Sequence, residues 1–412
     1  DVRVIEGDRG TVKVFTTGGN LLVDNDAVTL QFDERSTIDA SSQFGATDAE
    51  RSFGTLTIAG FGGADLDLFR QGQISSGRIA ALRELRDVTL VQAQAQLDEL
   101  AHGLALSMST AQISGTAASA GPQTGFDIDV ADLASGNQIQ VTITQGGTPQ
   151  TFTFIRVDDP ASLPLPDDAT ADPNDTVIGI DFSGGLAGAA GAMDAALDAA
   201  LGVDVSVSSP GAGTLQILND AGGTVTVDAV EARVTPSATQ DSGLQLALFT
   251  DGGGLYTGSF DGGSQKVGLA GRLTVNAAVV ADSSLLVSYS TSPPTGSGDP
   301  ARPLELLARF NETTFTFAPS SGLGTSGAPL STNIRDFGQR IINFQGQQSQ
   351  NAQSAQDAQG IVVDALNDRF KSDTAVNIDE ELGRLTELQN AYAANARVMS
   401  VVQELIDVLL RV

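Results

Sequence analysis

The stretch that decides the fold is the last one, residues 377–412, NIDEELGRLTELQNAYAANARVMSVVQELIDVLLRV. Its apolar residues recur every seven positions in two series that stand three residues apart, which is the a/d pattern of a coiled coil. The first series comprises Ile378, Leu385, Tyr392, Met399 and Ile406, and the second comprises Leu388, Asn395, Val402 and Leu409. A single helix would leave this stripe in water, so the pattern predicts a helix that packs against partners.

The start of this helix is also specified by the sequence. Asn377 is a good N-cap residue, and Glu380, three residues later, completes a capping box. We therefore expect the helix to begin directly after Asn377.

The segment before the last helix predicts its first partner. Residues 334–370 carry a second apolar seam with a glutamine-rich middle, formed by Ile334, Phe337, Ile341, Phe344, Ala355, Ala358, Val362 and Ala365. The linker KSDTAV (371–376) is short enough to return the chain antiparallel, which predicts a helical hairpin over 334–412. Because the polar middle at 345–354 can cover little apolar surface, we expect at least one further helix, from a missing part of the protein or from neighbouring subunits.

The rest of the chain divides by composition into three parts. Residues 1–120 combine short alternating strands with a helix expected over 77–108, which carries leucines at helical spacing and a break near Asp87. Residues 121–241 form an inserted acidic α+β module. Between residues 126 and 241 there are only two basic residues, Arg156 and Arg233, and seventeen acidic ones. Residues 242–333 are expected to return to the host domain through irregular segments and a few strands.

The predicted fold class is therefore α+β and multidomain. Long antiparallel helices of coiled-coil type accompany β-rich domains, one of which is inserted into the other. The sequence begins at Asp1 directly in an alternating, strand-like segment, DVRVIEG. From this we expect the sequence to be a piece of a longer protein whose missing part lies before Asp1.

Composition excludes several classes of function. The chain has 412 residues and a formal net charge of −28, which repels nucleic acid phosphates and anionic lipid headgroups, so neither partner is expected. Without cysteine there is no disulfide, thiolate zinc site or cysteine nucleophile. The single histidine, His102, follows Asp98 and Glu99 by one turn and is interpreted as a solvated helix residue with acidic neighbours.

Two patterns suggest a ligand, but each lacks part of the required motif. Gly322, Gly324 and Gly327 form GxGxxG, yet Pro329 follows where a dinucleotide site needs a helix N-terminus. Aspartates cluster at 127–132 and in the loop at 167–175, but the first cluster lacks the glycine and glutamate of a calcium-binding loop. We therefore predict no cofactor, no metal site and no catalytic residues, and hence no enzyme.

Three segments resemble one known family. The tail, with its NIDEEL and LQNAYAANARV motifs and its final LL, resembles the C-terminal helix of the flagellar axial proteins, which comprise the rod, hook and hook-associated group. Residues 77–105, GRIAALRELRDVTLVQAQAQLDELAHGLA, and 255–276, LYTGSFDGGSQKVGLAGRLTVN, are similar to segments of a hook-associated member that carries inserted domains. Hook-associated protein 3 shares the tail but should lack these segments. The insert from about 138 to 235 is similar to a repeat of hook-type flagellar proteins.

The resemblance implies a structural part of the bacterial flagellum. In that family the C-terminal helix pairs with an N-terminal helix, which is absent from this sequence, and the paired helices polymerise into the inner tube. The implied protein forms a homo-oligomeric ring at the junction between hook and filament, between hook protein and hook-associated protein 3. It is extracellular after export through the flagellar type III apparatus, and an export chaperone shields its apolar stripe beforehand.

The predicted assembly and chaperone interface is thus the seam of the last helix, residues Ile378, Leu385, Leu388, Tyr392, Asn395, Met399, Val402, Ile406 and Leu409. Two alternatives stay open at this point. The seam could serve only the fold of its own chain, since most apolar stripes on helices are core. The protein could also be a secreted β-rich adhesin or a calcium- or glycan-binding surface protein, which would explain the glycine content, the acidity and the strands.

Overall fold

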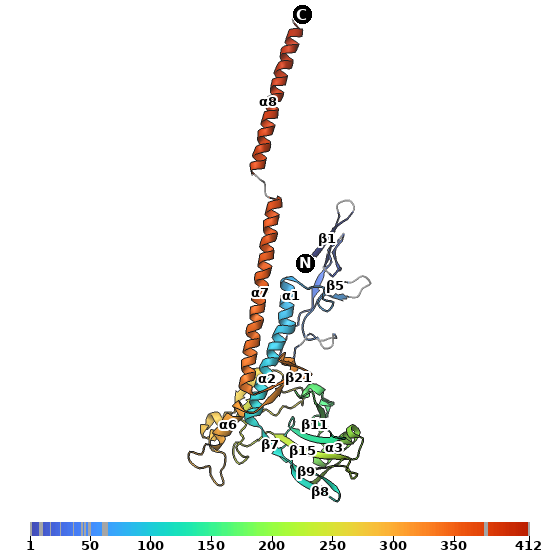
Figure 1. The fold of residues 1–412 in the computed structure, drawn as a ribbon, viewed down its shortest axis with the longest axis vertical. Coiled ribbons are helices and arrows are strands. Elements are labelled where there is room, and N and C mark those ends of the chain that lie inside the picture. The colour runs from blue at the N-terminus through green and yellow to red at the C-terminus, as the bar shows by residue number, and fades with distance from the viewer. Residues whose placement is uncertain are drawn as a thin grey trace. The chain divides into compact units, whose positions relative to one another are not determined.

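The computed structural model describes residues 2–7, 11–16, 18–24, 26–35, 37–42, 44, 47, 51–59, 65–374 and 378–410 (Figure 1). Helices and several separate sheets occur along the chain, which confirms the predicted α+β fold class. The chain forms two compact units, residues 1–341 and residues 342–412. The boundaries predicted for the four domains stay predictions.

Two small antiparallel sheets occupy the first part of the chain. Their strand orders are β1-β2-β3 and β4-β5-β6. The strands are β1 Val2–Glu6, β2 Val12–Thr16, β3 Leu21–Val23, β4 Leu30–Phe32, β5 Leu56–Ala59 and β6 Asp65–Asp67. The alternation of apolar residues predicted strands here, and the structure forms them as two sheets.

A long helix with one irregular turn follows these sheets. It consists of α1 Gly77–Glu84, the π-helical turn η2 Leu85–Thr89 and α2 Leu90–Ser109. The break predicted near Asp87 is therefore a wide turn within a continuous helix, which shifts the faces of the helix without interrupting it. Arg86 ties this turn to the first sheets, because its Nη1 donates a hydrogen bond to the Gly54 carbonyl oxygen at 2.8 Å.

The packed face of α2 is made of small residues. Ala101, Ala105 and Leu106 are buried with Tyr256 and Leu269 in one cluster. The leucines whose spacing predicted the helix, Leu82, Leu85, Leu90 and Leu97, are exposed. Spacing alone therefore predicted the helix correctly, but the exposed leucines do not form its core face.

A module with a large core of its own lies between α2 and the returning chain. One sheet has strand order β12-β11-β10-β15-β7 and the other β13-β14-β9-β8. The elements are β7 Ala111–Ser114, β8 Thr116–Ala120, β9 Gln123–Asp129, β10 Gln138–Gln145, β11 Thr148–Val157, the 3-10 turns η3 Pro160–Ser162 and η4 Asp167–Ala169, β12 Asp175–Asp181, α3 Leu186–Leu201, β13 Ser206–Gly211, β14 Thr214–Leu218 and β15 Val225–Val234. The two sheets and α3 bury one shared hydrophobic core (Figure 1).

Local turn chemistry explains the central hairpin of this module. Gly146 and Gly147 both have positive φ, as a two-residue hairpin turn requires, and they join β10 to β11. The glycine turn TQGGTPQ (144–150) between two alternating segments predicts this β-hairpin, and the structure confirms it. At the other end of the module, β7 and β15 pair antiparallel with Ala111 opposite Val234, so its first and last strands are neighbours in one sheet.

The returning segment is built from short elements. They are β16 Phe249–Asp251, β17 Gly254–Leu255, α4 Leu269–Arg272, β18 Leu273–Val275, α5 Ala277–Ala281, the 3-10 turn η5 Ser283–Leu286, α6 Ala301–Asn311, β19 Phe315–Phe317, the 3-10 turn η6 Pro319–Ser321, β20 Gly324–Thr325 and β21 Ala328–Thr332. The glycines of the GxGxxG pattern lie in the turn and hairpin around β20. Because strand β21 follows them, they do not open onto a helix N-terminus.

Arg302 holds part of this segment together. Its side chain is fully buried, and its six hydrogen bonds in the described structure all go to backbone carbonyl oxygens, which belong to Thr239, Gly243, Leu244, Gln245, Leu285 and Ser288. Burial lowers the pKa of the guanidinium, with Tyr289 opposing that shift, and the group stays charged far above neutral pH. One side chain thus satisfies carbonyl groups that the irregular backbone around it leaves unpaired.

The interpretation of His102 as a solvated residue is wrong. His102 is half-buried, its Nδ1 lies 2.5 Å from the hydroxyl of Tyr256, and its neighbours Asp98 and Glu99 are buried. Burial lowers the pKa of His102 well below its usual value, and the nearby charges of Lys266 and Arg233 lower it further. The partner comes from a loop more than a hundred residues later, so the local sequence could not indicate it.

The single histidine predicts a simple pH dependence of stability. Because the folded-state pKa is depressed, the unfolded chain binds a proton below about pH 6.5 while folded His102 stays neutral. Stability should therefore fall as pH drops from 7 toward 5, by up to about 1.4 kcal/mol per pH unit from this residue. Urea unfolding at several pH values measures it, and a His102→Gln variant should lose the dependence in this window. An unchanged slope in that variant would contradict this assignment.

The last two helices are α7 Ile334–Thr374 and α8 Ile378–Leu409. The first turns of α7 belong to the core of the first unit, where Phe337 stacks on Phe317 with ring centroids 3.6 Å apart. From residue 346 onward, every described side chain of α7 is exposed. Of the helices in the described ranges, none is both long and apolar enough to cross a membrane.

Candidate assembly surface

The candidate site is the surface of α8. At 1.5 Å per residue its 32 residues extend over roughly 48 Å. Its first turn carries Asp379, Glu380 and Glu381, whose negative charges favour the N-terminal end of a helix dipole. Asn377 lies outside the described residues, so the predicted capping box stays a prediction.

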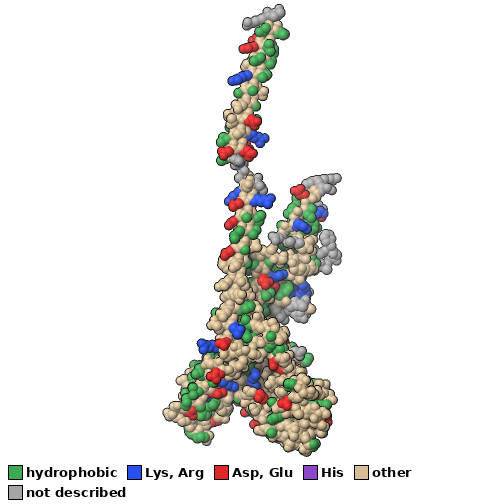
Figure 2. Space-filling model, in the orientation of Figure 1, with side chains coloured by type: hydrophobic (Ala, Val, Ile, Leu, Met, Phe, Trp, Pro, Cys, Tyr) green, Lys and Arg blue, Asp and Glu red, His purple; other side chains and the backbone are tan. Residues whose placement is uncertain are grey.

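The structure places the predicted seam entirely in solvent. All nine predicted interface residues lie on α8, and none of the described residues of α8 is buried. Exposure is large for the apolar members, with 71% at Ile378, 79% at Tyr392 and 78% at Leu409. Figure 2 shows these hydrophobic side chains along the length of the helix, between charged ones. Exposed apolar surface of this extent is uncommon on a soluble protein.

The exposure of α7 and α8 bears on the helical hairpin predicted over 334–412. A hairpin would bury the facing stripes of α7 and α8, whereas the described side chains of both helices beyond residue 345 are exposed. Several apolar residues of α7 remain uncovered in addition to those of α8, namely Ile361, Val362, Val363, Leu366 and Phe370. The pairing of these two helices stays a prediction.

A second apolar stripe on α8 was missed in the sequence. It begins halfway along the helix and repeats at intervals of three and four residues, through Ala391, Ala394, Val398, Val401, Leu405 and Val408. At 3.6 residues per turn it is rotated by roughly 120° from the predicted seam. The signal was present as a second heptad series. It was hidden because the first half of the helix has charged residues, such as Arg384 and Glu387, at the equivalent positions.

The remaining face of α8 is polar. Its second half presents Arg397, Ser400, Glu404 and Asp407 on one side, so apolar and polar surfaces are sharply separated there. Asn395 is the polar member of the predicted seam, at a position where coiled coils use a polar residue to fix register. The first half of α8 thus has one apolar stripe and the second half has two.

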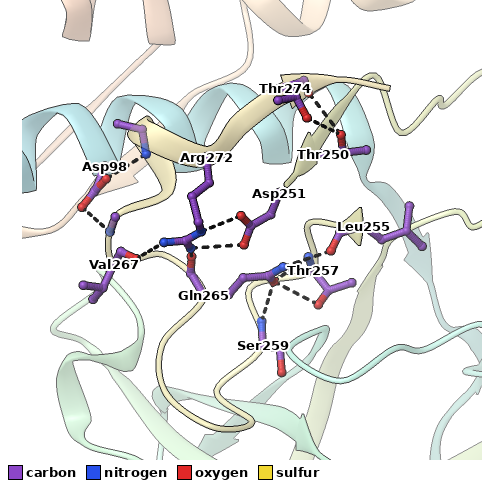
Figure 3. A network of polar contacts seen from close by, with 12 residues as sticks. Asp98, Thr250, Asp251, Leu255, Thr257, Ser259, Gln265, Val267, Arg272 and Thr274 are labelled. Carbon is purple, nitrogen blue, oxygen red and sulfur yellow. Dashed lines mark hydrogen bonds and ion pairs between the residues drawn. The ribbon is translucent and has the colours of Figure 1, made fainter. Parts of the chain in front are cut away.

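A polar network joins the returning segment to α2. Asp98 of α2 accepts hydrogen bonds from the backbone amides of Gly268 and Ala270, at 2.7 and 2.9 Å. Gln265 Oε1 accepts from the amides of Thr257, Gly258 and Ser259, and Arg272 pairs with Asp251 at 2.7 Å (Figure 3). This loop is the 255–276 segment whose resemblance to hook-associated proteins was noted from the sequence.

The same loop holds the inserted module. Asp261 accepts hydrogen bonds from the hydroxyl of Ser135 and from the backbone amides of Asp158 and Asp159, and these bonds help to lower its pKa against the effect of burial. Asn137 Nδ2 donates a hydrogen bond to the Thr257 carbonyl oxygen of the loop at 3.4 Å. The module is therefore fixed to the loop by directional hydrogen bonds of side chains that sequence reasoning had not singled out.

Comparison with known protein families gives two matches, one near each end of the chain. Residues 1–128, which include the first sheets and α1–α2, match the model described as "Flagellar hook-associated protein FlgK helical domain". Residues 372–412, which include α8, match the model described as "Flagellar basal body rod FlgEFG protein C-terminal". Together the two matches support a FlgK-type flagellar hook-associated protein. Comparison with curated proteins found no significant match.

The FlgK-type assignment confirms the resemblance recognised in the tail and in residues 77–105. It places the chain among the structural components of the bacterial flagellum, which assemble into its axial structure. Such families are in general not enzymes. Within the described residues no group of three or more histidine, aspartate or glutamate side chains could hold a metal ion.

Proposed function

We propose that this FlgK-type chain is the structural part that joins hook to filament, and that it assembles with copies of itself through α8. The observation that carries the proposal is the full exposure of an apolar heptad seam along α8, within a segment that matches a flagellar family model. Large apolar surface of this kind is stable in water only when another protein surface covers it.

The second stripe supports self-assembly into a closed ring. A helix with two apolar faces about 120° apart needs two neighbours, and a subunit in a ring of identical copies has a neighbour on either side. The first half of α8, with one stripe, needs fewer contacts. The partners proposed beyond the ring are hook protein on one side and hook-associated protein 3 on the other.

The same surface must be shielded before assembly. We propose that a flagellar export chaperone covers the seam of α8 until the chain leaves the cell through the flagellar type III apparatus. An amphipathic helix lying in an apolar groove is a common recognition mode, so the seam residues would serve in turn as chaperone and subunit contacts.

Deletion of the gene in the parent bacterium tests the junction role. We expect hooks to remain, filaments to be absent and flagellin to accumulate in the culture medium, because subunits exported past a missing joint cannot attach. Electron microscopy and analysis of supernatant protein measure these outcomes. Normal filaments on motile cells would overturn the proposal. Re-introduction of the intact gene is the matched control and should restore filaments.

A further inference from the structure

A large cavity lined by polar and apolar residues lies within the first unit. Its volume is about 900 Å³, and its walls come from α2, from the five-stranded sheet, from the loop at 256–267 and from the segment at 313–319. It therefore lies where the module meets the returning chain. The polar network that fixes the module also fixes the geometry of this cavity.

The floor of the cavity is the polar face of the five-stranded sheet. Side chains alternate along a strand, so one face of β10, β11 and β15 carries the core residues, and the other carries polar residues together with the buried Ile155 and Val157 of β11. Gln138 lies opposite Arg233, and Arg233 lies opposite Gln112, so these three form a row across neighbouring strands. Gln140 and Thr153 form the next pair along the sheet. All five line the cavity.

Arg233 is the unusual member of this floor. It is one of only two basic residues in the acidic module, and its guanidinium makes no hydrogen bond or ion pair with any part of the chain that the structure describes. The neighbouring Glu231 carboxylate already accepts a hydrogen bond from Gln112, with 2.6 Å between Nε2 and Oε2. The Arg233 side chain is exposed, so its guanidinium lies on an accessible part of the cavity wall.

Further positive and donor groups meet Arg233 from the opposite elements. Arg309 of α6 lines the cavity, and its own carboxylate partner, Glu305, is 3.5 Å away. His102 lines it from α2 and is bonded to Tyr256 through Nδ1, which leaves Nε2 as the ring nitrogen without that contact. Arg309 also donates a hydrogen bond to the carbonyl oxygen of Thr110, so among the described residues Arg233 has more donors left for an anion.

A buried hydroxyl also lacks a partner in this cavity. Thr153 is 2% exposed, and its Oγ1 makes no hydrogen bond of good geometry, although it lies near enough to Asp175 to affect that carboxyl. A buried polar group of this kind is costly unless a ligand or water satisfies it. Asp168, Asp172 and Asp175 line the same cavity, so an anion is favoured only beside the arginines.

We propose that this cavity binds a small oxyanion, a carboxylate or a phosphate, between Arg233 and Arg309. The planar guanidinium presents two parallel N–H donors that match two oxygens of such a group. The glutamine amides and the Thr153 hydroxyl of the sheet face hold the remaining polar atoms of the ligand. Binding joins β15 of the module to α6 of the returning segment, so the occupied site fastens the module more tightly.

Isothermal titration calorimetry at fixed ionic strength tests this with three probes, inorganic phosphate, succinate and the neutral succinamide. We expect phosphate or succinate to bind and succinamide to give no heat. Arg233→Gln should weaken binding at least about tenfold, because the two parallel N–H donors of the guanidinium and its charge are lost. Arg78→Gln, which changes an exposed arginine on α1, is the matched control and should bind as the unchanged chain does.

The outcomes distinguish the two classes of oxyanion, phosphates and carboxylates. Binding of phosphate alone assigns the site to phosphate-bearing ligands, and binding of succinate alone assigns it to carboxylates. If circular dichroism shows that Arg233→Gln does not fold, Arg233→Lys replaces it. Lysine keeps the positive charge but lacks the two parallel N–H donors, so it should still weaken binding. Absence of heat with both anions, or equal affinity in the folded Arg233 variant, overturns the proposal without affecting the assembly role of α8.

Discussion

Cells that carry Leu388→Asp together with Val402→Asp are expected to swim no better than cells without the gene. Each side chain contributes about 2 kcal/mol when buried in a seam, and a carboxylate in its place adds the cost of burying an unpaired charge. A loss of about 4 kcal/mol or more weakens an interface roughly a thousandfold. Motility, filament counts by electron microscopy and co-purification with the export chaperone measure the effect.

The helix supplies its own control for this experiment. Gln389→Asp together with Ser400→Asp adds the same charge at nearby positions on the polar face of α8, and this pair should leave motility unchanged. The thermal unfolding of the isolated chain should be the same in all variants, because α8 buries no residue within it. Unchanged motility in the seam variant would contradict the assembly role. A lowered unfolding temperature would indicate that the seam serves the fold of its own chain.

Replacement of Arg302 by methionine is expected to have the largest effect on the stability of the first unit. Methionine keeps much of the volume of the side chain but removes all donors, so the carbonyl groups around position 302 lose their partners in a buried site. Loss of a buried charged partner costs about 3–5 kcal/mol. Urea unfolding followed by circular dichroism measures the change in the free energy of unfolding.

Arg335→Met provides the comparison for this stability measurement. Arg335 lies on α7 with an exposed side chain, and its replacement should change the free energy of unfolding by less than about 0.5 kcal/mol. If Arg302→Met were equally mild, the carbonyl groups would have to find other donors. The view of Arg302 as the element that organises the irregular segment would then be wrong.

Sequence patterns predicted those parts of the fold that depend on interactions between residues close together in the chain. The pair Gly146 and Gly147 identified the hairpin between β10 and β11, because few other residues adopt both positive φ angles. The heptad series identified α8, and the leucine spacing identified the long helix before the module. In each case a period or a turn acts over a few residues, and the neighbouring sequence contains the whole signal.

Features that depend on contacts between distant segments could not be predicted in this way. His102 looked solvated because its partner Tyr256 is supplied by another segment, and Asp98 looked like a surface acid although it binds the amides of Gly268 and Ala270. Arg233 and Arg309 come from a strand and a helix that only the folded topology brings to one cavity. The second stripe of α8 is different, since its heptad signal was present in the sequence.

The pairing of β7 with β15 has a consequence for how such chains can change. Because Ala111 and Val234 lie opposite each other, the chain leaves the module beside the point where it entered. A gene could gain, lose or exchange this cassette by recombination with little change in the path of the surrounding backbone, since a short link would close the gap. The module can therefore vary in sequence and size while the surrounding backbone keeps its path.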